Sequence, residues 1–240
     1  MSTTDPTSDA LAGLVNLRDL GGMPAGEGSG ATRAGIVLRS DAPQPGDREP
    51  DGITWPPRLV LDLRDASELN GTPHPLATVA EVQQIELLAG IHSTEVTHPL
   101  PVLYQLALRD AAAKLVRAFR LALEADGPVL VHCAAGKDRT GVVSAMLLSA
   151  AGVRSDAIIA DYVRTDRNMF RVLQRLEMAP ALPPGVSEED VRELISTPVE
   201  AIEGVLETFA AHDEHAAGWL RAHGVADGEI DRWRRKFRAD

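Results

Sequence analysis

One short stretch constrains the fold more than any other part of the chain. Residues 129–131 form a compact aliphatic run typical of a buried strand, and a polar, glycine-containing loop follows it. Residues 142–151 are apolar on nearly every side, so a helix there has to lie in the middle of a core. The 240 residues are ample for one sizeable core and marginal for two. We therefore expect a single α/β-sized domain built around this strand, loop and helix.

The segments around this unit predict further strands and a helix. Strands are predicted at residues 35–38 and 59–62, and a weaker one at 81–88. Residues 41–58 hold five of the 16 prolines, which predicts an irregular connection. A helix is predicted from near Pro101 to residues 126–128, because apolar residues recur at helical spacing from Leu108 to Leu123.

Downstream of residue 152 the pattern is helical throughout. We expect a helical lid or subdomain at about residues 155–210, interrupted at 179–185. Helix starts are predicted from a cap at Ser155 and from capping boxes at 187–190 and 197–200. The basic residues of the last helix, from Asp227 onward, are interpreted as a solvated face that complements the helix dipole rather than as a binding patch. We expect residues 1–10 to be a disordered lead-in and 11–240 to form one domain.

Composition narrows the function classes. The net charge of −11 disfavours nucleic acid as a partner, because an acidic surface repels phosphate backbones. A single cysteine excludes an intramolecular disulfide and a multi-cysteine zinc site. No run approaches the roughly 20 apolar residues of a membrane span, and the first ten residues lack the features of a secretory signal. A cytoplasmic location is expected, with export without a signal peptide left open.

The only cysteine lies where the buried strand meets the loop. Five residues separate Cys133 from Arg139, enough for successive backbone N–H groups to converge on one point, to which the N-terminus of the next helix adds its positive end. Gly136 permits the tight curvature, and the planar fork of Arg139 can hold two phosphate oxygens at once. Such a nest binds a tetrahedral dianion. The other interpretation of a lone cysteine at a strand end is a small buried hydrophobic residue.

The positive charge of the N–H groups, the helix N-terminus and Arg139 also favours the thiolate form of Cys133. The thiolate would then be a nucleophile directly beneath a bound phosphorus atom. Attack in line with the leaving oxygen gives a thiophosphate that water later hydrolyses. Thr140 could donate a hydrogen bond to the thiolate and ease its departure. We interpret His132 as a residue that fixes the loop through hydrogen bonds rather than one that transfers protons.

The segment HCAAGKDRTG resembles the active-site loop of cysteine-dependent protein-tyrosine phosphatases, and more narrowly that of their atypical bacterial branch. Segments elsewhere match as well: 16–22, 39–40, 61–64 with Glu68, 151–153 and 160–162. The resemblance implies a cysteine-phosphatase fold with a central, mostly parallel sheet flanked by helices, and neither a metal nor a cofactor. It also implies that the loop binds the substrate through Ala134, Ala135, Gly136, Lys137, Asp138 and Arg139. The proline-rich segment 41–58 departs from the family, in which a helix commonly leads into the 61–64 strand.

Expulsion of the leaving group requires a general acid, and two aspartates compete for that role. Asp138 lies inside the loop, and we expect it to be the acid or the water-activating base; its alternative role is a cap of the following helix. Asp62 ranks second, at the end of a strand, and its alternative role is an ion pair with Arg64 or Arg139. Lys137 is expected to add positive charge at the pocket rim, and its alternative is a solvated surface lysine.

The functional prediction is a phosphomonoesterase, most simply a protein-tyrosine phosphatase with activity on phosphoserine, phosphothreonine and phosphoinositides. Its partners would be a phosphorylated protein or a phosphoinositide as substrate and inorganic phosphate as product. The alternatives are a phosphoinositide phosphatase as the main role, a catalytically silent phospho-binding module and, as a minor one, a sulfurtransferase. The pair His212 and His215 resembles a metal motif, but we interpret it as a solvated helix face.

Overall fold

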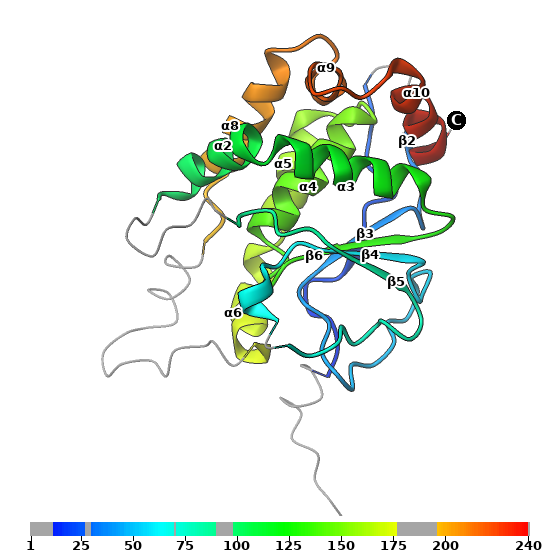
Figure 1. Ribbon diagram of the computed structural model, residues 1–240, viewed down its shortest axis with the longest axis vertical. Coiled ribbons are helices and arrows are strands. Elements are labelled where there is room, and N and C mark those ends of the chain that lie inside the picture. Colours follow the sequence, from blue (N-terminus) through cyan, green and yellow to red (C-terminus); the bar gives the residue numbers. More distant parts are fainter. Residues whose placement is uncertain (1–11, 27–29, 70, 90–97, 177–195, 240) are drawn as a thin grey trace, which may run out of the picture.

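The computed structural model describes residues 12–26, 30–69, 71–89, 98–176 and 196–239. Its main sheet has the order β1-β3-β6-β4-β5 (Figure 1). The strands are β1 (Arg18–Asp19), β3 (Val37–Ser40), β6 (Val129–His132), β4 (Leu59–Asp62) and β5 (Glu81–Gln84). Only β1 runs antiparallel to its neighbour within this sheet, so the prediction of a mostly parallel sheet is confirmed. A separate pair joins β2 (Ala31–Thr32) to β7 (Arg238–Ala239).

Parallel pairing brings the carboxyl ends of the central strands to one edge of the sheet. His132, the last residue of β6, is in register with Ser40 on β3 and with Asp62 on β4. The chain leaves all three strands at this edge, which is where α/β sheets bind ligands. The loop that begins at Cys133 therefore lies between two neighbouring strand ends.

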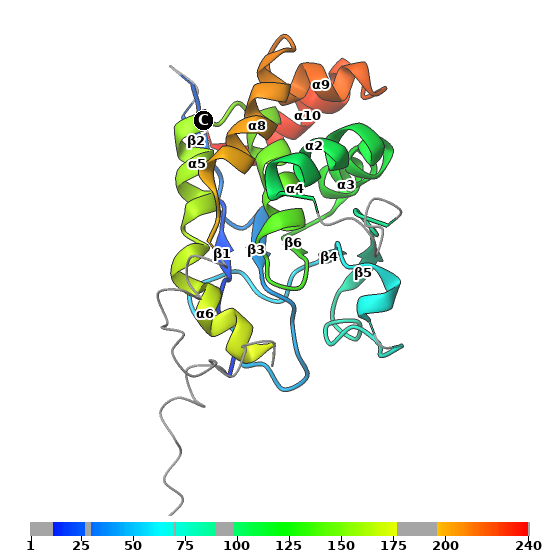
Figure 2. The ribbon, with the colours of Figure 1, turned by 90° about the vertical axis from the view of Figure 1, so that its left-hand side faces the viewer.

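Helices occupy most of the rest of the described chain. They are α2 (Leu100–Asp110), α3 (Ala112–Glu124), α4 (Asp138–Ala150), α5 (Ser155–Val163), α6 (Asp166–Arg175), α8 (Val199–Ala210), α9 (Ala216–Ala222) and α10 (Asp227–Phe237), with a short 3₁₀ helix, η1 (Ala66–Glu68). Figures 1 and 2 show α2–α4 and α8–α10 gathered on one side of the sheet. Every residue of α4 from Thr140 to Ala150 is buried, as predicted from its apolar composition. None of the described helices is long and apolar enough to cross a membrane.

The two faces of the sheet pack differently. On one face Val37, Leu61 and Val131 join the large core formed with the helices. On the other face Leu38, Val60 and Leu130 pack against side chains from the connecting segments, among them Ile53, Trp55, Leu76 and Ala80. The proline-rich segment 41–58, confirmed as free of helix and strand, thus supplies part of the second core layer.

Three details of the predicted helices are wrong. The helix predicted near residues 101–125 is two helices, because Ala111 leaves the helical region with φ −110° and ψ 19°. An alanine-rich run carries no sequence signal for such a break. Ser155 is the first residue of α5 and not its cap. Thr197 donates its hydroxyl and its backbone N–H to Asp166 Oδ1, so α8 begins after Pro198 without the predicted capping box.

Some predictions fall outside the described residues: the lead-in at 1–10, the capping box at 187–190 and the interruption at 179–185. The described part of the proposed lid consists of α5, α6 and α8. The division into a lead-in and a single domain with a lid stays a prediction.

The basic residues at the end of the chain form the predicted solvated face only in part: Arg232 and Arg235 are exposed, whereas Lys236 and Arg238 bind neighbouring helix ends. Lys236 Nζ donates to the carbonyl oxygens of Ala122, Leu123 and Ala125 at the end of α3. Arg238 donates to the carbonyl oxygen of Ala151 after α4. The charges thus cap two neighbouring helices, whose last carbonyl groups have no partners within the helix itself.

Replacement of Lys236 by methionine is expected to lower the free energy of unfolding by about 1–3 kcal/mol, because the carbonyl groups at the end of α3 lose a charged donor. Arg235→Met on the same helix is the matched control, since Arg235 is exposed. Urea unfolding followed by circular dichroism measures both. Equal losses in the two variants would contradict a specific capping role.

Candidate active site

The predicted loop lies between β6 and α4 at the carboxyl edge of the sheet. Cys133 directly follows β6 and is 3% exposed, and α4 begins at Asp138. The backbone enters the loop from the β6 end that β3 and β4 flank on either side. All six residues predicted to bind the substrate, 134–139, therefore lie on this loop and on the first turn of the helix.

The carbonyl groups of the loop are bound on its outer side. The oxygen of Ala134 accepts from the Ala42 N–H at 2.9 Å, and Asn16 Nδ2 donates to the oxygens of Ala135 and Gly136 at 3.3 Å each. A trans peptide unit points its N–H away from its own carbonyl. The N–H groups of residues 135–137 therefore point to the inner side of the loop, which is the geometry of an anion-binding nest. Asn16, from the matching segment 16–22, thus supports the loop from its outer side.

A buried ionic cluster supports the loop from behind. Arg39 Nη2 donates to the Gly136 oxygen at 2.8 Å, and Arg39 Nη1 lies 2.6 Å from Asp161 Oδ2. Arg18 Nε lies 2.5 Å from the other carboxylate oxygen of Asp161. Burial acts to raise the pKa of Asp161, but the charges of Arg39 and Arg18 outweigh it and the net shift is downward. Arg39 thus connects the loop backbone to a buried ion pair with Asp161 and Arg18, which restricts how far the loop can move.

Gly136 is required by both its conformation and its surroundings. Its φ is +69°, a region in which residues with a side chain are strained. A Cβ at this position would lie 2.2 Å from the carbonyl oxygen of Ser40. The loop therefore packs its backbone directly on the end of β3.

Arg139 is held by a planar pairing with Glu68 from η1. Both of its terminal nitrogens donate to the Glu68 carboxylate, and Nη1 also donates to the carbonyl oxygen of Leu63 at 3.3 Å. Burial acts to lower the pKa of Arg139, but Glu68 and the charge of Cys133 outweigh it and raise the pKa overall. These bonds use three of the five guanidinium N–H groups and fix the plane of the fork. Glu68 had been noted only as part of a matching segment, without a role.

Asp138 lies within a chain of hydroxyl groups. Its Oδ1 accepts from Tyr104 Oη on α2 at 2.7 Å, and Tyr104 Oη lies 2.8 Å from Tyr162 Oη on α5. Lys137 Nζ is 3.5 Å from the same carboxylate oxygen and donates to the carbonyl oxygen of Ser196. At 8% exposure Lys137 is not the solvated surface lysine of the alternative interpretation. Tyr162 was noted only as part of the matching segment 160–162, without a role, and Tyr104 was not predicted.

Asp62 forms the ion pair that was considered as its alternative role, with Arg64 as the partner. The guanidinium of Arg64 faces the carboxylate, with Nη2 at 2.7 Å from Oδ2 and Nε at 2.9 Å from Oδ1. Burial acts to raise the pKa of Asp62, and the hydrogen bonds from Arg64 together with His132 bring it below its ordinary value. Asp62 is therefore held as a paired carboxylate.

Thr140 has a buried hydroxyl with no hydrogen-bond partner within the described chain. The predicted bond to Cys133 is accordingly not formed in this state. A buried hydroxyl without a partner is uncommon, and at the first turn of α4 it can serve a bound ligand.

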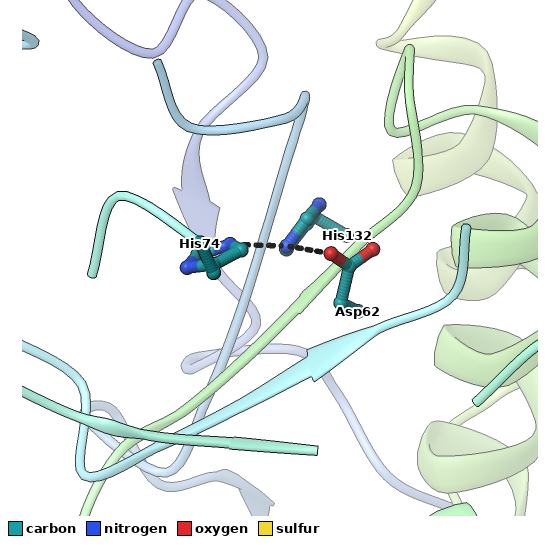
Figure 3. Close-up of side chains that lie close together, drawn as sticks. All are labelled: Asp62, His74 and His132. Atoms are coloured by element: carbon teal, nitrogen blue, oxygen red, sulfur yellow. Dashed lines mark hydrogen bonds and ion pairs between the residues drawn. The ribbon is translucent and has the colours of Figure 1, made fainter. Parts of the chain in front are cut away.

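A second buried cluster adjoins the loop at its first residue. His132 Nε2 lies 3.0 Å from His74 Nε2 and 3.9 Å from Asp62 Oδ2 (Figure 3). The three ligand atoms lie within 4.8 Å of one another, a spacing that a metal ion could bridge. His74, in the turn between η1 and β5, was not predicted to be near the loop.

Comparison with known sequences identifies the family. The profile described as the tyrosine phosphatase family matches residues 10–239. The chain belongs to this family. As a member it is a phosphoric monoester hydrolase.

Individual relatives of this phosphatase match it over different lengths. The triple specificity protein phosphatase PtpB of Mycobacterium tuberculosis is 27% identical in an alignment of 204 residues that covers 78% of this chain and 74% of that protein. A tyrosine-protein phosphatase of Nostoc commune is 34% identical in an alignment of 114 residues that covers 44% of this chain and 39% of that protein. The solved core catalytic domain of the PP-IP phosphatase SIW14 from S. cerevisiae, in complex with citrate, matches 67% of this chain and 87% of its own, with a TM-score of 0.36 and 17% identity.

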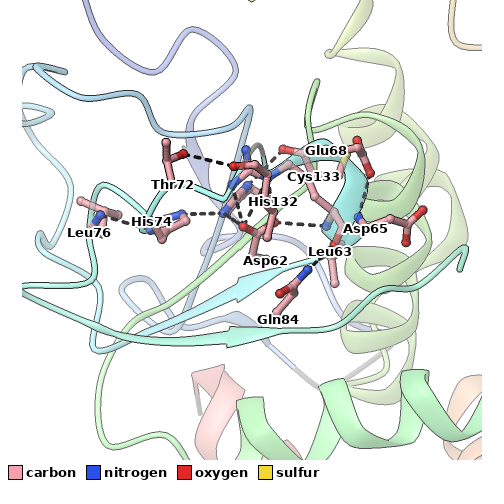
Figure 4. A network of polar contacts seen from close by, with 12 residues as sticks. Asp62, Leu63, Asp65, Glu68, Thr72, His74, Leu76, Gln84, His132 and Cys133 are labelled. Atoms are coloured by element: carbon pink, nitrogen blue, oxygen red, sulfur yellow. Dashed lines mark hydrogen bonds and ion pairs between the residues drawn. The ribbon is translucent and has the colours of Figure 1, made fainter.

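In this phosphatase a cavity of about 530 Å³ opens beside the loop. Glu68, the partner of Arg139, and His74, the neighbour of His132, both line it, as does Asp62 at the end of β4, so the cavity lies next to the loop on the β4 side. Figure 4 shows these three side chains around His132 and Cys133. Its remaining lining is mixed, with Thr72 and Gln84 among the polar residues and several prolines among the apolar ones. A cavity of this size can hold a substituted aromatic ring or a sugar-like ring.

Proposed function

We propose that this phosphatase removes phosphate from phosphotyrosine in proteins, with phosphoserine, phosphothreonine and phosphoinositides as further substrates, through a phosphorylated Cys133. The observation that carries the proposal is the outward binding of the loop carbonyls, which leaves the N–H groups of residues 135–137 on the inner side of the loop, where they can bind an anion. The name of the M. tuberculosis relative, a triple specificity phosphatase, supports a broad substrate range.

The roles of the loop residues follow from their positions. The nest and Arg139 hold the phosphoryl oxygens, and the Cys133 sulfur attacks phosphorus as the bond to the leaving oxygen breaks. Asp138 gives its proton to the leaving oxygen. In the second step a water attacks phosphorus, Asp138 takes its proton and the S–P bond breaks to release phosphate and the thiolate. The unpartnered hydroxyl of Thr140 is available to donate to that thiolate.

We assign the acid role to Asp138 because Asp62 is already engaged. Arg64 donates to both carboxylate oxygens of Asp62; burial acts to raise the pKa of Asp62, but Arg64 and His132 outweigh it and lower the pKa, which makes Asp62 a poor proton donor. Tyr104 occupies Oδ1 of Asp138, which leaves the second carboxylate oxygen to face the substrate. Asp62 would then act by holding the strand end next to His132.

Replacement of Asp138 by asparagine is expected to slow turnover of alkyl phosphates such as phosphoserine by about 10²–10³-fold. Aryl phosphates with a good leaving group should slow by less than about tenfold, because their oxygen leaves without a proton. Asp62→Asn is the matched control, and its effect should not depend on the leaving group. Steady-state kcat values of both variants, measured on both substrate classes, show which aspartate is the general acid. A leaving-group dependence in Asp62→Asn instead would exchange the two roles.

The substrate class is tested by phosphate release from matched phosphotyrosine and phosphoserine peptides and from phosphoinositide, each without added metal. The proposal expects turnover of all three, fastest with phosphotyrosine. A phosphoinositide rate well above the peptide rates would make that the main role. Binding of phosphopeptide without release of phosphate from any substrate would indicate a binding module. The cytoplasmic location expected from the sequence stays a prediction.

A further inference from the structure

A hydrogen-bond chain enters the cysteine loop from a turn outside it. The backbone N–H of Leu76 donates to His74 Nδ1 at 3.1 Å. His74 Nε2 faces His132 Nε2 at 3.0 Å, and His132 Nδ1 faces the carbonyl oxygen of Cys133, also at 3.0 Å (Figures 3 and 4). All three contacts are within hydrogen-bond distance, and they lie end to end through the two rings.

The outer contacts determine where the protons of this chain lie. Leu76 can only donate, so His74 Nδ1 carries no proton, and a neutral His74 ring must carry it on Nε2. The oxygen of Cys133 can only accept, so His132 Nδ1 carries the proton of its ring and its Nε2 accepts from His74. Both rings are then neutral, with every ring nitrogen in a hydrogen bond. Burial, as the largest cause, lowers the pKa of His74 to about 4 and also lowers that of His132, consistent with neutral rings.

The same assignment weighs against a metal ion in this cluster. His74, His132 and Asp62 have the spacing of a metal site, but a ring nitrogen that carries a proton is not a ligand. For His74 Nε2 to bind a metal, its proton would have to move to Nδ1, where it would oppose the N–H of Leu76. The cluster is therefore better described as a hydrogen-bond chain.

We propose that His74 is a positioning residue that holds His132 in the tautomer that donates to the carbonyl oxygen of Cys133. Without His74, His132 has an alternative: its Nε2 could carry the proton and donate toward Asp62 Oδ2, now 3.9 Å away. The lone pair of Nδ1 would then face the lone pairs of the Cys133 oxygen. The other charged groups that act on this ring, Arg64 and Arg139, are cations and offer no acceptor.

The tautomer bears on the reaction through one peptide unit. The carbonyl of Cys133 and the N–H of Ala134 are its two ends, and a hydrogen bond accepted at the oxygen polarises the N–H at the opposite end. That N–H is the first of the loop after the nucleophile. Ala134 is one of the residues predicted to bind the phosphoryl group, so His74 would act on the transition state through His132 and this N–H without touching the substrate; this role rests on the function proposed above.

The test compares His74→Gln, whose amide keeps an N–H donor, with His74→Phe, which keeps a ring of similar size but has no donor. ¹⁵N chemical shifts should show His132 protonated at Nδ1 in the wild type and in His74→Gln, and at Nε2 in His74→Phe. We expect kcat to fall about tenfold in His74→Phe, the value of one hydrogen bond, with KM nearly unchanged, and to stay within about threefold in His74→Gln. His74→Leu is the second apolar variant should His74→Phe fail to fold.

Three outcomes would overturn the proposal. One is retention of the Nδ1 proton of His132 in folded His74→Phe, and another is an equal loss of kcat in the glutamine and phenylalanine variants. The third is stoichiometric binding of Zn²⁺ by the wild type that His74→Phe abolishes, which would make the cluster a metal site. The NMR result does not depend on turnover. An intact tautomer in a wild type that releases no phosphate would therefore reject the proposed function and leave the positioning role standing.

Discussion

Replacement of Cys133 by serine is expected to lower kcat by 10⁴-fold or more, on the order of what the loss of a catalytic nucleophile costs. A serine hydroxyl does not ionise near neutral pH. The positive electrostatic potential of the loop N–H groups and the α4 N-terminus, which favours a thiolate, therefore cannot produce a comparable nucleophile. The change in volume is small at a side chain that is 3% exposed. The free energy of unfolding should therefore change by less than about 1 kcal/mol. Phosphate release and thermal unfolding, measured on the same preparations, separate the two effects.

Binding provides the control for this substitution. The carbonyl groups of Ala134–Gly136 are held by Ala42, Asn16 and Arg39, none of which depends on the sulfur. Cys133→Ser should therefore still bind inorganic phosphate with an affinity within about tenfold of the wild type. The wild type quenched during turnover should carry one phosphoryl group on Cys133, detectable by mass spectrometry, and the variant none. Turnover within tenfold of the wild type would show that sulfur is not the nucleophile.

The sequence predicted the parts of the site that are continuous in the chain. The strand at 129–132, the loop and the helix that follows have strong local patterns. A short aliphatic run and a helix that is apolar on every side both have to lie in the core, so their positions can be predicted from the sequence. The strand at 59–62 was found for the same reason. Register between parallel strands then places Asp62 beside His132, a contact that the sequence could suggest only through the general geometry of α/β sheets.

The residues that the sequence analysis missed, or named without a role, enter the site from elsewhere in the fold. Glu68 lies on a three-residue 3₁₀ helix, His74 in a turn and Tyr104 on a helix at some distance along the chain. Their contacts with the loop arise from tertiary packing, and no spacing rule connects them to it. A sequence can show that Asp62 has two plausible roles. Only the placement of Arg64 against its carboxylate distinguishes them.

The errors on helix ends have a related cause. The lysine and arginines in the last turn of α10 have the pattern of side chains that stabilise the C-terminal end of their own helix. The same charges can equally bind the last carbonyl groups of a neighbouring helix. Lys236 reaches the end of α3 because α10 packs beside it. The sequence pattern shows that a charged side chain is present near a helix end. Which helix end that side chain binds depends on how the helices pack.

Replacement of Arg139 by lysine is expected to lower kcat/KM by about 10³-fold, although the positive charge is kept. The planar fork of Arg139 meets Glu68 with two terminal nitrogens, and this pairing aims the remaining N–H groups of the guanidinium. A lysine ammonium has neither the fork nor a fixed plane, so two oriented donors to the phosphoryl oxygens are lost. Loss of a single oriented donor in other enzymes costs about 10²–10³-fold in rate. Initial rates on a phosphotyrosine peptide measure the effect.

Glu68→Gln separates orientation from charge, since glutamine keeps the shape of Glu68 and one acceptor oxygen. We expect a loss of about tenfold in kcat/KM, and a double variant with Arg139→Lys that is little worse than Arg139→Lys alone, because the two residues act as one unit. The pKa of Glu68 is lowered: burial acts against this shift, and the hydrogen bond from Arg139 outweighs it. Glu68 is then ionised throughout the range from about pH 5 to 8, so the ratio of wild-type to Glu68→Gln rates should be constant there. Additive losses in the double variant would mean that Glu68 acts on the substrate independently of Arg139.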